Sequence, residues 1–312
     1  MTEVKVIHCN SDQELFEVLQ LGNPQWRTAK YGDIIYRGQA DAEWRLSPSA
    51  FRPSTKFGYR YLIQCGISGN PLTQARAEFL ALKEFANLAD QIGLLVPGDS
   101  QIFRETVVPP ELFRSWPNRE IWQTLAIAQH HGIPTRLLDF SFDPRTAAFF
   151  AALGLTADVP TLGTKRTEAE FFAIWAVDLR FIRLVQEVTS NQSRIREISV
   201  PRATNPNLHA QQGLFLLDTN AAYSETDGEY LSLDAVLCSE VEYWKSRPGD
   251  WPTADPDSVY ALPITKIVAP KTIAEDVLRR IHVGGHNTAH LAPSYDGVVD
   301  ALRLIQSENY FT

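Results

Sequence analysis

The sequence predicts a single α+β domain in which helices flank a mixed or antiparallel central sheet. Residues 171–179 (FFAIWAVDL) and 213–218 (GLFLLD) are nearly continuous apolar runs, which is typical of buried strands. Residues 74–92 and 119–130 instead carry apolar side chains at helical spacing. No repeat, low-complexity tract or linker divides the 312 residues, and their 44% hydrophobic content is enough for one large core.

The first half of the chain carries clear start and stop signals. Ser11 and Glu14 form a capping box that predicts a helix over residues 11–21. Residues 32–37 predict a short strand, and residues 44–72 an irregular stretch rich in Pro, Gly and Tyr. The helix at 74–92 follows. The helix at 119–130 has Asn118 as its expected N-cap, and it ends in HHGIP, where Gly132 and Pro134 stop it.

The second half alternates strands and helices. Residues 136–142 (RLLDFSF) predict a strand, after which Asp143 caps and Pro144 begins a helix that ends at Gly154. A polar loop separates this helix from the two apolar strands named above. The remaining predicted elements are a strand at 260–270, a helix capped by Thr272 and Glu275 that ends near 282, and a last helix at 295–307.

Composition excludes several classes of protein. The net charge of −8 and the pI of about 5.4 argue against a broadly basic nucleic-acid face. No apolar run approaches the roughly 20 residues that cross a bilayer, and the first residues do not resemble a secretory signal, so no membrane contact is expected. Three scattered cysteines, Cys9, Cys65 and Cys238, suit free thiols in a reducing cytoplasm.

Common catalytic motifs are missing from the sequence. It has no G-x-G-x-x-G, Walker loop, G-x-S-x-G or H-E-x-x-H. His282, His286 and His290 recur at intervals of four, which on one helix would form a stripe that could hold a metal. Gly284 and Gly285 interrupt that helix, so we interpret these histidines as helix-end or loop residues and expect no metal site.

Three segments place polar side chains directly beside a predicted buried strand. They are Arg37-Gly38-Gln39, residues 129–151 (QHHGIPTRLLDFSFDPRTAAFFA) and residues 209–217 (HAQQGLFLL). Strand ends are rigid and leave the core, so they are common ligand sites. Alternation along residues 136–142 sends Asp139 and Ser141 to one face of the sheet.

Structural roles compete with functional ones for these residues. Arg37 could simply pair with a buried Asp139, and His130 and His131 could satisfy carbonyls at a helix end. Gln211 and Gln212 could be hydrogen-bond partners within the fold. Asp143 is better explained as a helix cap, and Arg136 and Arg145 could be surface charges.

At these residues the sequence resembles the FRG-domain family, named for a (Phe/Tyr)-Arg-Gly motif. The motif here is Tyr36-Arg37-Gly38, continuing through GQADAEWRLSPSAFR. It is followed in order by AQHHGIPTRLLDFSFDPRTAAFFA, NPNLHAQQGLFLL and APSYDGVVDAL. The resemblance implies an FRG domain over residues 30–312, preceded by a helical lead-in over residues 1–29.

The order of these motifs is also similar to ADP-ribosyltransferases, including DNA-targeting members of the DarT type. That resemblance implies an ADP-ribosyltransferase-like fold and NAD as the substrate. It assigns Arg37 to holding NAD, together with Gly38 and Gln39 of the same motif. Asp139 and Ser141 would order the ribose side. Gln211 or Gln212 falls where those enzymes carry a glutamate.

A glutamine cannot act as a base near neutral pH, so the catalytic base stays open. His130 or His131 could serve, as could Glu240 and Glu242, whose E-x-E spacing would put both on one face of a strand. The leading hypothesis is a transferase that modifies a nucleic-acid or protein acceptor, plausibly a bacterial toxin or anti-phage effector restrained by a neutralising antitoxin protein. The alternatives are a non-catalytic nucleotide- or nucleic-acid-binding module and an NAD glycohydrolase.

Overall fold

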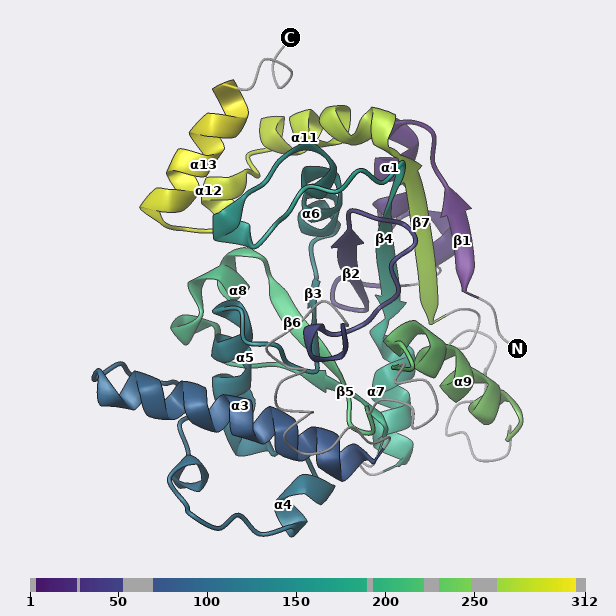
Figure 1. Cartoon of the computed structure of the whole chain (residues 1–312). Coiled ribbons are helices and arrows are strands. Elements are labelled where there is room, and N and C mark those ends of the chain that lie inside the picture. Colours follow the sequence, from purple (N-terminus) through teal and green to yellow (C-terminus); the bar gives the residue numbers. More distant parts are fainter. Residues whose placement is uncertain are drawn as a thin grey trace.

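A computed structural model describes residues 4–26, 29–52, 70–189, 193–221, 230–247 and 263–306. Cys65 and most of the stretch expected to be irregular lie outside these residues. The core is one seven-stranded sheet with the order β1-β7-β4-β2-β3-β6-β5 (Figure 1). Only β1 and β7 pair in parallel, and all other neighbours are antiparallel. The predicted α+β class with a mixed sheet is therefore confirmed.

The strands are β1 (Lys5–His8), β2 (Ile34–Gln39), β3 (Leu137–Ser141), β4 (Phe171–Asp178), β5 (Ile195–Ile198), β6 (Gly213–Asp218) and β7 (Ile264–Pro270). The helices are α1 (Asp12–Leu19), α3 (Pro71–Gln91), α4 (Glu111–Arg114), α5 (Trp122–His130), α6 (Pro144–Thr156), α7 (Leu179–Val188), α8 (Pro206–Ala210), α9 (Leu233–Lys245), α11 (Ala274–Val283), α12 (Thr288–Leu291) and α13 (Tyr295–Gln306). The segment expected to be a helical lead-in includes β1, which forms an edge of the sheet. The proposed division of the chain at residue 29 stays a prediction.

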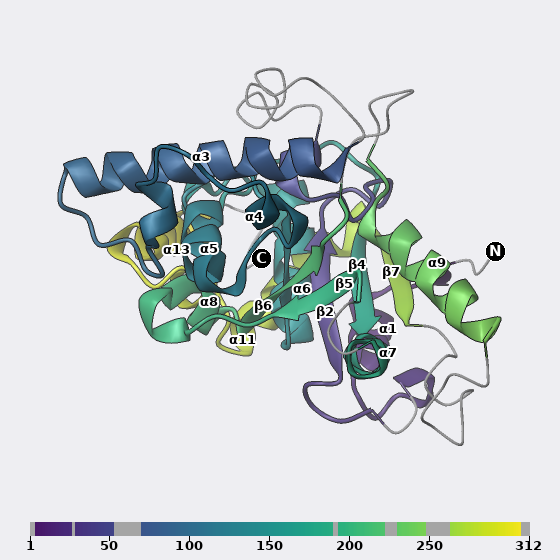
Figure 2. The same ribbon diagram turned by 90° about the horizontal axis from the view of Figure 1, so that it is seen from below.

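Alternation along the strands assigns the helices to the two faces of the sheet. Ile34 and Tyr36 of β2 join a core cluster with α1, α6 and α11, whereas Ile35 joins a cluster with α7 and α9 on the other face. Leu137 of β3 packs against α3 and α5. Because Tyr36 lies opposite Ser141 in register, Leu137 and Tyr36 are on the same face. Figure 2 shows α3 and α5 together, well apart from α7 and α9.

One face of the sheet is consequently covered by two separate groups of helices. The first group, α1, α6 and α11, packs on β2, β4 and β7, and the second, α3 and α5, packs on β3, β5 and β6. The boundary between the groups runs along β2 and β3. Those two strands are paired only at Tyr36 and Ser141, so they diverge over the rest of their length. At this boundary the side chain of Asp139 in β3 is exposed, whereas that of Arg37 in β2 is largely buried.

The N-terminus of α6 forms as the sequence predicts. The carboxylate of Asp143 accepts a hydrogen bond from the backbone N–H of Arg145, and Pro144 is the first helical residue. The predicted end at Gly154 is wrong, because α6 continues to Thr156. A Cβ at Gly154 would lie 2.5 Å from Cβ of Ala40, so this glycine permits close packing and does not end the helix.

Two other predicted caps are wrong for a shared reason. A 3₁₀ turn precedes each helix, at Arg119–Ile121 before α5 and at Lys271–Ile273 before α11. Asn118 therefore makes no side-chain cap bond, and it accepts a hydrogen bond from Ser115 instead. No side-chain cap starts α11 either. A 3₁₀ turn shifts the first α-helical residue by about one turn, which short capping patterns do not register.

Several elements have no counterpart in the sequence prediction, namely β1, β5, α4, α7, α8, α9 and α12. Glu240 and Glu242 lie on α9, so the expectation that both point to one face of a strand is wrong. Residues two apart on a helix point in different directions. Among the described residues, no helix is long and apolar enough to cross a membrane.

Candidate functional site

Arg37 and Asp139 meet where β2 and β3 diverge. Nη1 of Arg37 lies 2.7 Å from Oδ1 of Asp139 and donates a 2.8 Å hydrogen bond to the backbone oxygen of Asp139. The Arg37 side chain is 14% exposed, but that of Asp139 is 57% exposed. A residue on an inner strand of a seven-stranded sheet is normally covered on both faces. The exposure of Asp139 therefore shows that the sheet is open to solvent between the two groups of helices.

A second guanidinium, that of Arg52, belongs to the same cluster. Its Nε donates to the backbone oxygen of Ser47 at 3.0 Å. Burial and the nearby charge of Arg37 lower the pKa of Arg52 to about 10, although Asp139 acts in the opposite direction. Both arginines thus lie close enough to Asp139 to interact with its charge. We call Arg37, Arg52 and Asp139 the arginine cluster, which carries two positive charges and one negative charge.

The side-chain amide of Gln129 in α5 contacts the arginine cluster. Nε2 of Gln129 donates to Oδ1 of Asp139 at 3.3 Å, and Oε1 of Gln129 accepts from the hydroxyl of Thr135. Asp139 is thereby held from both sides, by β2 and by α5. Nε of Arg37 has no hydrogen-bond partner among the described residues. A buried donor without a partner favours a ligand that supplies an acceptor.

The charge state of Asp139 follows from its surroundings. Partial desolvation favours the neutral carboxyl, but the charge and hydrogen bond of Arg37 outweigh it, so the pKa of Asp139 lies below its ordinary value. Asp139 is therefore ionised at neutral pH and compensates part of the charge of the two arginines. A ligand that replaces this carboxylate, or that binds beside it, should be anionic.

The lowered pKa of Asp139 predicts a defined dependence of stability on pH. Since an unfolded aspartate titrates near about 3.9, the stabilising contribution of Asp139 is complete above about pH 5. It is lost as the pH falls through the lower pKa of the folded state. We expect the difference in free energy of unfolding between wild type and Asp139→Asn to be constant from about pH 7 to 5 and to shrink below about pH 4. Denaturant unfolding at stepped pH measures this difference. A difference that stays unchanged down to about pH 3 would contradict the assignment.

Ser141 ties the end of β3 to the neighbouring loop. Its buried hydroxyl donates to the backbone oxygen of Gln211 at 2.6 Å and accepts from the N–H of Asp143 at 2.9 Å. Nε2 of Gln211 donates to the backbone oxygen of Leu291 at 3.2 Å. Both side chains thus have partners within the fold. Asp139 and Ser141 do share one face of β3, as predicted, but only Asp139 contacts Arg37.

Gln212 occupies a different position from Gln211. Its backbone has a φ of 48°, in the left-handed region, at the turn before β6. Its Oε1 accepts a 2.6 Å hydrogen bond from the hydroxyl of Tyr31, whose exposed ring lies in the loop before β2. Gln212 is therefore a contact between two loops, and the described structure provides no link between its side chain and the arginine cluster.

Gly38 and Gln39 face the interior of the protein. A Cβ at Gly38 would lie 1.9 Å from the backbone oxygen of Ala147, so Gly38 is needed for the close approach of α6. The assignment of Gly38 to NAD binding stays a prediction of the resemblance. Gln39 is buried, its Nε2 donates to the oxygen of Arg45, and its Oε1 accepts from the indole of Trp175 at 2.7 Å. Its amide is therefore occupied on both sides.

The two candidate base histidines lie at the end of α5. Nε2 of His130 is 3.1 Å from the amide nitrogen of Asn207 in α8, and its ring centroid is 5.1 Å from that of His131. Burial, followed by the charge of His131, lowers the pKa of His130. His130 follows Gln129 in the chain and so lies near the arginine cluster, but neither histidine contacts it.

A further cluster was not predicted, at the N-terminus of α6. Nε2 of His286 lies 3.1 Å from Oδ2 of Asp143, which also pairs with Arg145. The rings of His286 and His290 are 4.7 Å apart. The three histidines of the possible metal stripe do not share a helix, because α11 ends at Val283. Among the described residues, no three His, Cys, Asp or Glu side chains are arranged to hold a metal ion.

Arg136 has a structural role, and its interpretation as a surface charge is wrong. Its side chain is 1% exposed, and its Nε donates to Oε2 of Glu78 in α3 at 2.6 Å. The same Oε2 accepts from the indole of Trp116 at 2.9 Å. Arg145 is exposed and paired with Asp143, which agrees with its interpretation as a surface charge.

Comparison with known families matches residues 98–158 to the FRG domain. The matched segment runs from before α4 through α5 and β3 to the end of α6, and it contains Gln129 and Asp139. It covers the second of the four motifs quoted above, whereas Arg37 and Gln211 lie outside it. Searches of curated proteins and of solved structures found no match to the chain.

Proposed function

We propose that the arginine cluster binds NAD and that the protein transfers ADP-ribose to a nucleic-acid or protein acceptor. The premise is that the chain belongs to the FRG-domain family through residues 98–158. The observation that carries this proposal is the ion pair of Arg37 with the exposed carboxylate of Asp139, with Arg52 close enough for its pKa to respond to both charges. The family match by itself shows neither transferase activity nor NAD as the substrate.

The residues of the cluster fit part of NAD. Two guanidinium groups suit a pyrophosphate, because each can donate two parallel hydrogen bonds to phosphate oxygens. The unpartnered Nε of Arg37 adds one more donor. Asp139, ionised and exposed, could accept from a ribose hydroxyl or stabilise a positive ribose centre. Gly38, Gln39 and Ser141 do not fit the roles that the resemblance gives them, because their surroundings lie within the fold.

The proposed transfer of ADP-ribose needs one base, and this chain can supply it. The bond between C1′ of the ribose and the nicotinamide nitrogen breaks, and nicotinamide leaves with the bonding electron pair. A lone pair of the acceptor forms the new bond to C1′, and the acceptor proton passes to a base. His130 is a suitable base, since its lowered pKa keeps it neutral at pH 7 and its ring is exposed.

Replacing Arg37 tests the proposal directly. We expect Arg37→Ala to lower the rate of nicotinamide release from NAD by about 10- to 100-fold, because a charge-assisted hydrogen bond contributes about 1.5–3 kcal/mol. Arg52→Ala should lose activity as well while leaving the Arg37–Asp139 ion pair in place. Radiolabelled NAD with nucleic-acid and protein acceptors, and release of free nicotinamide, are the two measurements.

Matched controls separate loss of the site from loss of the fold. Arg279→Ala removes an arginine from an exposed ion pair with Asp276 on α11 and should leave activity unchanged. Arg37→Lys keeps the charge but loses the planar fork, so we expect an intermediate rate. Wild-type protein that neither binds NAD nor releases nicotinamide with any acceptor would overturn the proposal.

One observation favours a second candidate, a non-catalytic nucleotide-binding module. Gln211 and Gln212, which by the resemblance stand where ADP-ribosyltransferases carry a glutamate, are both engaged in contacts within the fold. Calorimetric binding of NAD without nicotinamide release would support the module. Release of free ADP-ribose without a modified acceptor would indicate an NAD glycohydrolase. A toxin role and a neutralising partner stay predictions of the resemblance.

A further inference from the structure

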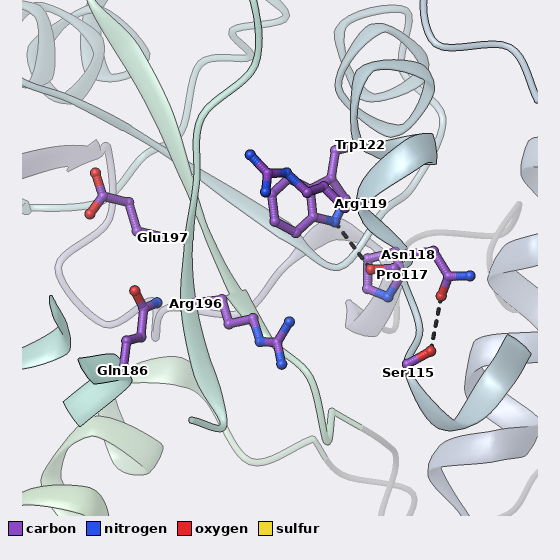
Figure 3. A pocket seen from close by; sticks show the side chains of 8 residues that line it. All are labelled: Ser115, Pro117, Asn118, Arg119, Trp122, Gln186, Arg196 and Glu197. Carbon is purple, nitrogen blue, oxygen red and sulfur yellow. Dashed lines mark hydrogen bonds between the residues drawn. The ribbon is translucent and has the colours of Figure 1, made fainter. Parts of the chain in front are cut away.

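A hollow of about 370 Å³ lies away from the arginine cluster, at the edge of the sheet formed by β5. Its walls come from the segment before α5, from α7 and from β5, and they include Ser115, Asn118, Arg119, Trp122, Gln186 and Arg196 (Figure 3). In the sheet order, β5 is separated from β2 by β6 and β3. The hollow is therefore a separate candidate site from the one that contains Arg37.

Two arginines line the hollow. Arg119 and Arg196 contribute two guanidinium groups, and in Figure 3 the Arg196 side chain extends from β5 toward Ser115 and Asn118. The one carboxylate in its lining, Glu197, is neutralised by Arg183, which donates to both of its oxygens at 2.8 and 3.0 Å. Guanidinium groups in the lining favour an anionic ligand group such as a phosphate.

The hollow also contains an aromatic surface. Trp122 is half-buried, and its Nε1 donates to the backbone oxygen of Pro117 at 3.1 Å, which fixes the orientation of the indole. The guanidinium carbon of Arg119 lies 5.9 Å from the ring centroid, near the outer limit of a cation–π contact. A half-buried, oriented indole beside an arginine is a surface on which a nucleobase can stack.

Polar groups of the lining can form hydrogen bonds with the edge of a base. The hydroxyl of Ser115 donates to Oδ1 of Asn118 at 3.2 Å, which leaves the amide nitrogen of Asn118 able to donate elsewhere. Nε2 of Gln186 is held by the backbone oxygen of Ile195 at 3.3 Å, so its Oε1 can accept. A donor and an acceptor thus lie in the same lining as the indole and the two cations.

We propose that this hollow binds a nucleoside monophosphate unit, with its base on Trp122 and its phosphate between Arg119 and Arg196. The volume lies at the lower end of the range for small-molecule sites, about 300–1,000 Å³, which suits one nucleotide better than a dinucleotide. The unit is either a free nucleotide or one residue of a single strand. This proposal does not depend on the function proposed for the arginine cluster.

Calorimetric titration of the full chain tests the site. We expect AMP or UMP to bind at least about tenfold more tightly than the matching nucleoside and than inorganic phosphate, because only the nucleotide engages both the ring and the cations. Arg119→Ala and Arg196→Gln should each weaken binding of the nucleotide by about tenfold or more. A four-residue single-stranded oligonucleotide distinguishes the two sources: tighter binding of the oligonucleotide than of the nucleotide indicates a nucleic-acid strand.

Two controls make the result specific. Arg114→Ala, an exposed arginine of α4 outside the hollow, should not change nucleotide binding, and Arg37→Ala should not change it either. Arg119→Lys keeps the charge and should lose less than Arg119→Ala, and thermal melting confirms that each variant is folded. Equal affinity for nucleoside and nucleotide, no binding at millimolar concentration, or loss of binding in Arg37→Ala would each overturn the proposal.

Discussion

Replacing Glu78 with glutamine is expected to lower the free energy of unfolding by about 3–5 kcal/mol, because it leaves the Arg136 guanidinium buried without a counter-charge. The two side chains are 4% and 1% exposed. Glu78 also accepts from Trp116, and Gln74 donates to it, so a single carboxylate organises the contact of α3 with β3. Denaturant unfolding of wild type and variant at pH 7 measures the loss.

An exposed pair and a double variant complete this test. Asp276→Asn removes the partner of Arg279 on the surface of α11, and we expect a change of less than about 1 kcal/mol. The double variant Glu78→Gln, Arg136→Met should be more stable than Glu78→Gln alone, because the uncompensated buried charge is gone. If Glu78→Gln were as mild as Asp276→Asn, the buried pair would not be the link between α3 and the sheet.

Replacing Gly38 with alanine is expected to cost about 3 kcal/mol or more, at or above the usual range for overpacking. The new Cβ would lie 1.9 Å from the backbone oxygen of Ala147 and 2.8 Å from the backbone nitrogen of Ala151, neither of which can rotate away. Helix α6 would have to move off β2. Because α6 borders the opening at Asp139, the variant should also weaken any ligand that binds the arginine cluster.

A matched glycine shows whether contact with α6 is the cause. A Cβ at Gly22 meets no atom within 4 Å, so Gly22→Ala should leave the free energy of unfolding within about 0.5 kcal/mol of wild type. Thermal and denaturant unfolding of both variants give the comparison. Equal effects of the two substitutions would mean that the close approach of α6 to Gly38 does not limit stability.

The substitutions of Glu78 and Gly38 both affect the boundary between the two groups of helices that cover one face of the sheet. Glu78 and Arg136 anchor the helices over β3, and Gly38 lets α6 lie close on β2. The arginine cluster lies between them, with Asp139 open to solvent. Variants that shift either group of helices are therefore expected to change ligand binding without touching Arg37 itself.

Much of the fold could be predicted from local patterns. The apolar runs became β4 and β6, the Asp143-Pro144 pair began α6, and the Ser11 cap began α1. These features depend on residues close together in the chain, so a short segment contains the information. Elements with weaker patterns were missed, and β5 is the clearest example, because its four residues place two adjacent charged side chains between two isoleucines and so lack the alternation of a strand.

Local sequence patterns predicted the surroundings of only some of the site residues. The sequence singled out Arg37 and Asp139 and allowed that Arg37 pairs with a buried Asp139; the structure confirms the pair, but Asp139 is exposed. The predictions for Gly38, Arg136 and Glu240 used only residue type and local spacing. In the structure all three lie in surroundings that residue type does not specify. Arg52 was quoted only as part of a motif, because nothing near it in the chain indicates Asp139 as a neighbour.

The sequence by itself determined that this protein has one α+β domain, where its main strands and helices begin, and that an arginine and an aspartate stand out beside buried strands. Only the tertiary structure decided which charges are buried, which glycine permits helix packing, and which central residue faces solvent. The physical reason is that burial and charge pairing depend on atoms brought together from distant parts of the chain, whereas helix caps and strand periodicity depend on neighbours within a few residues.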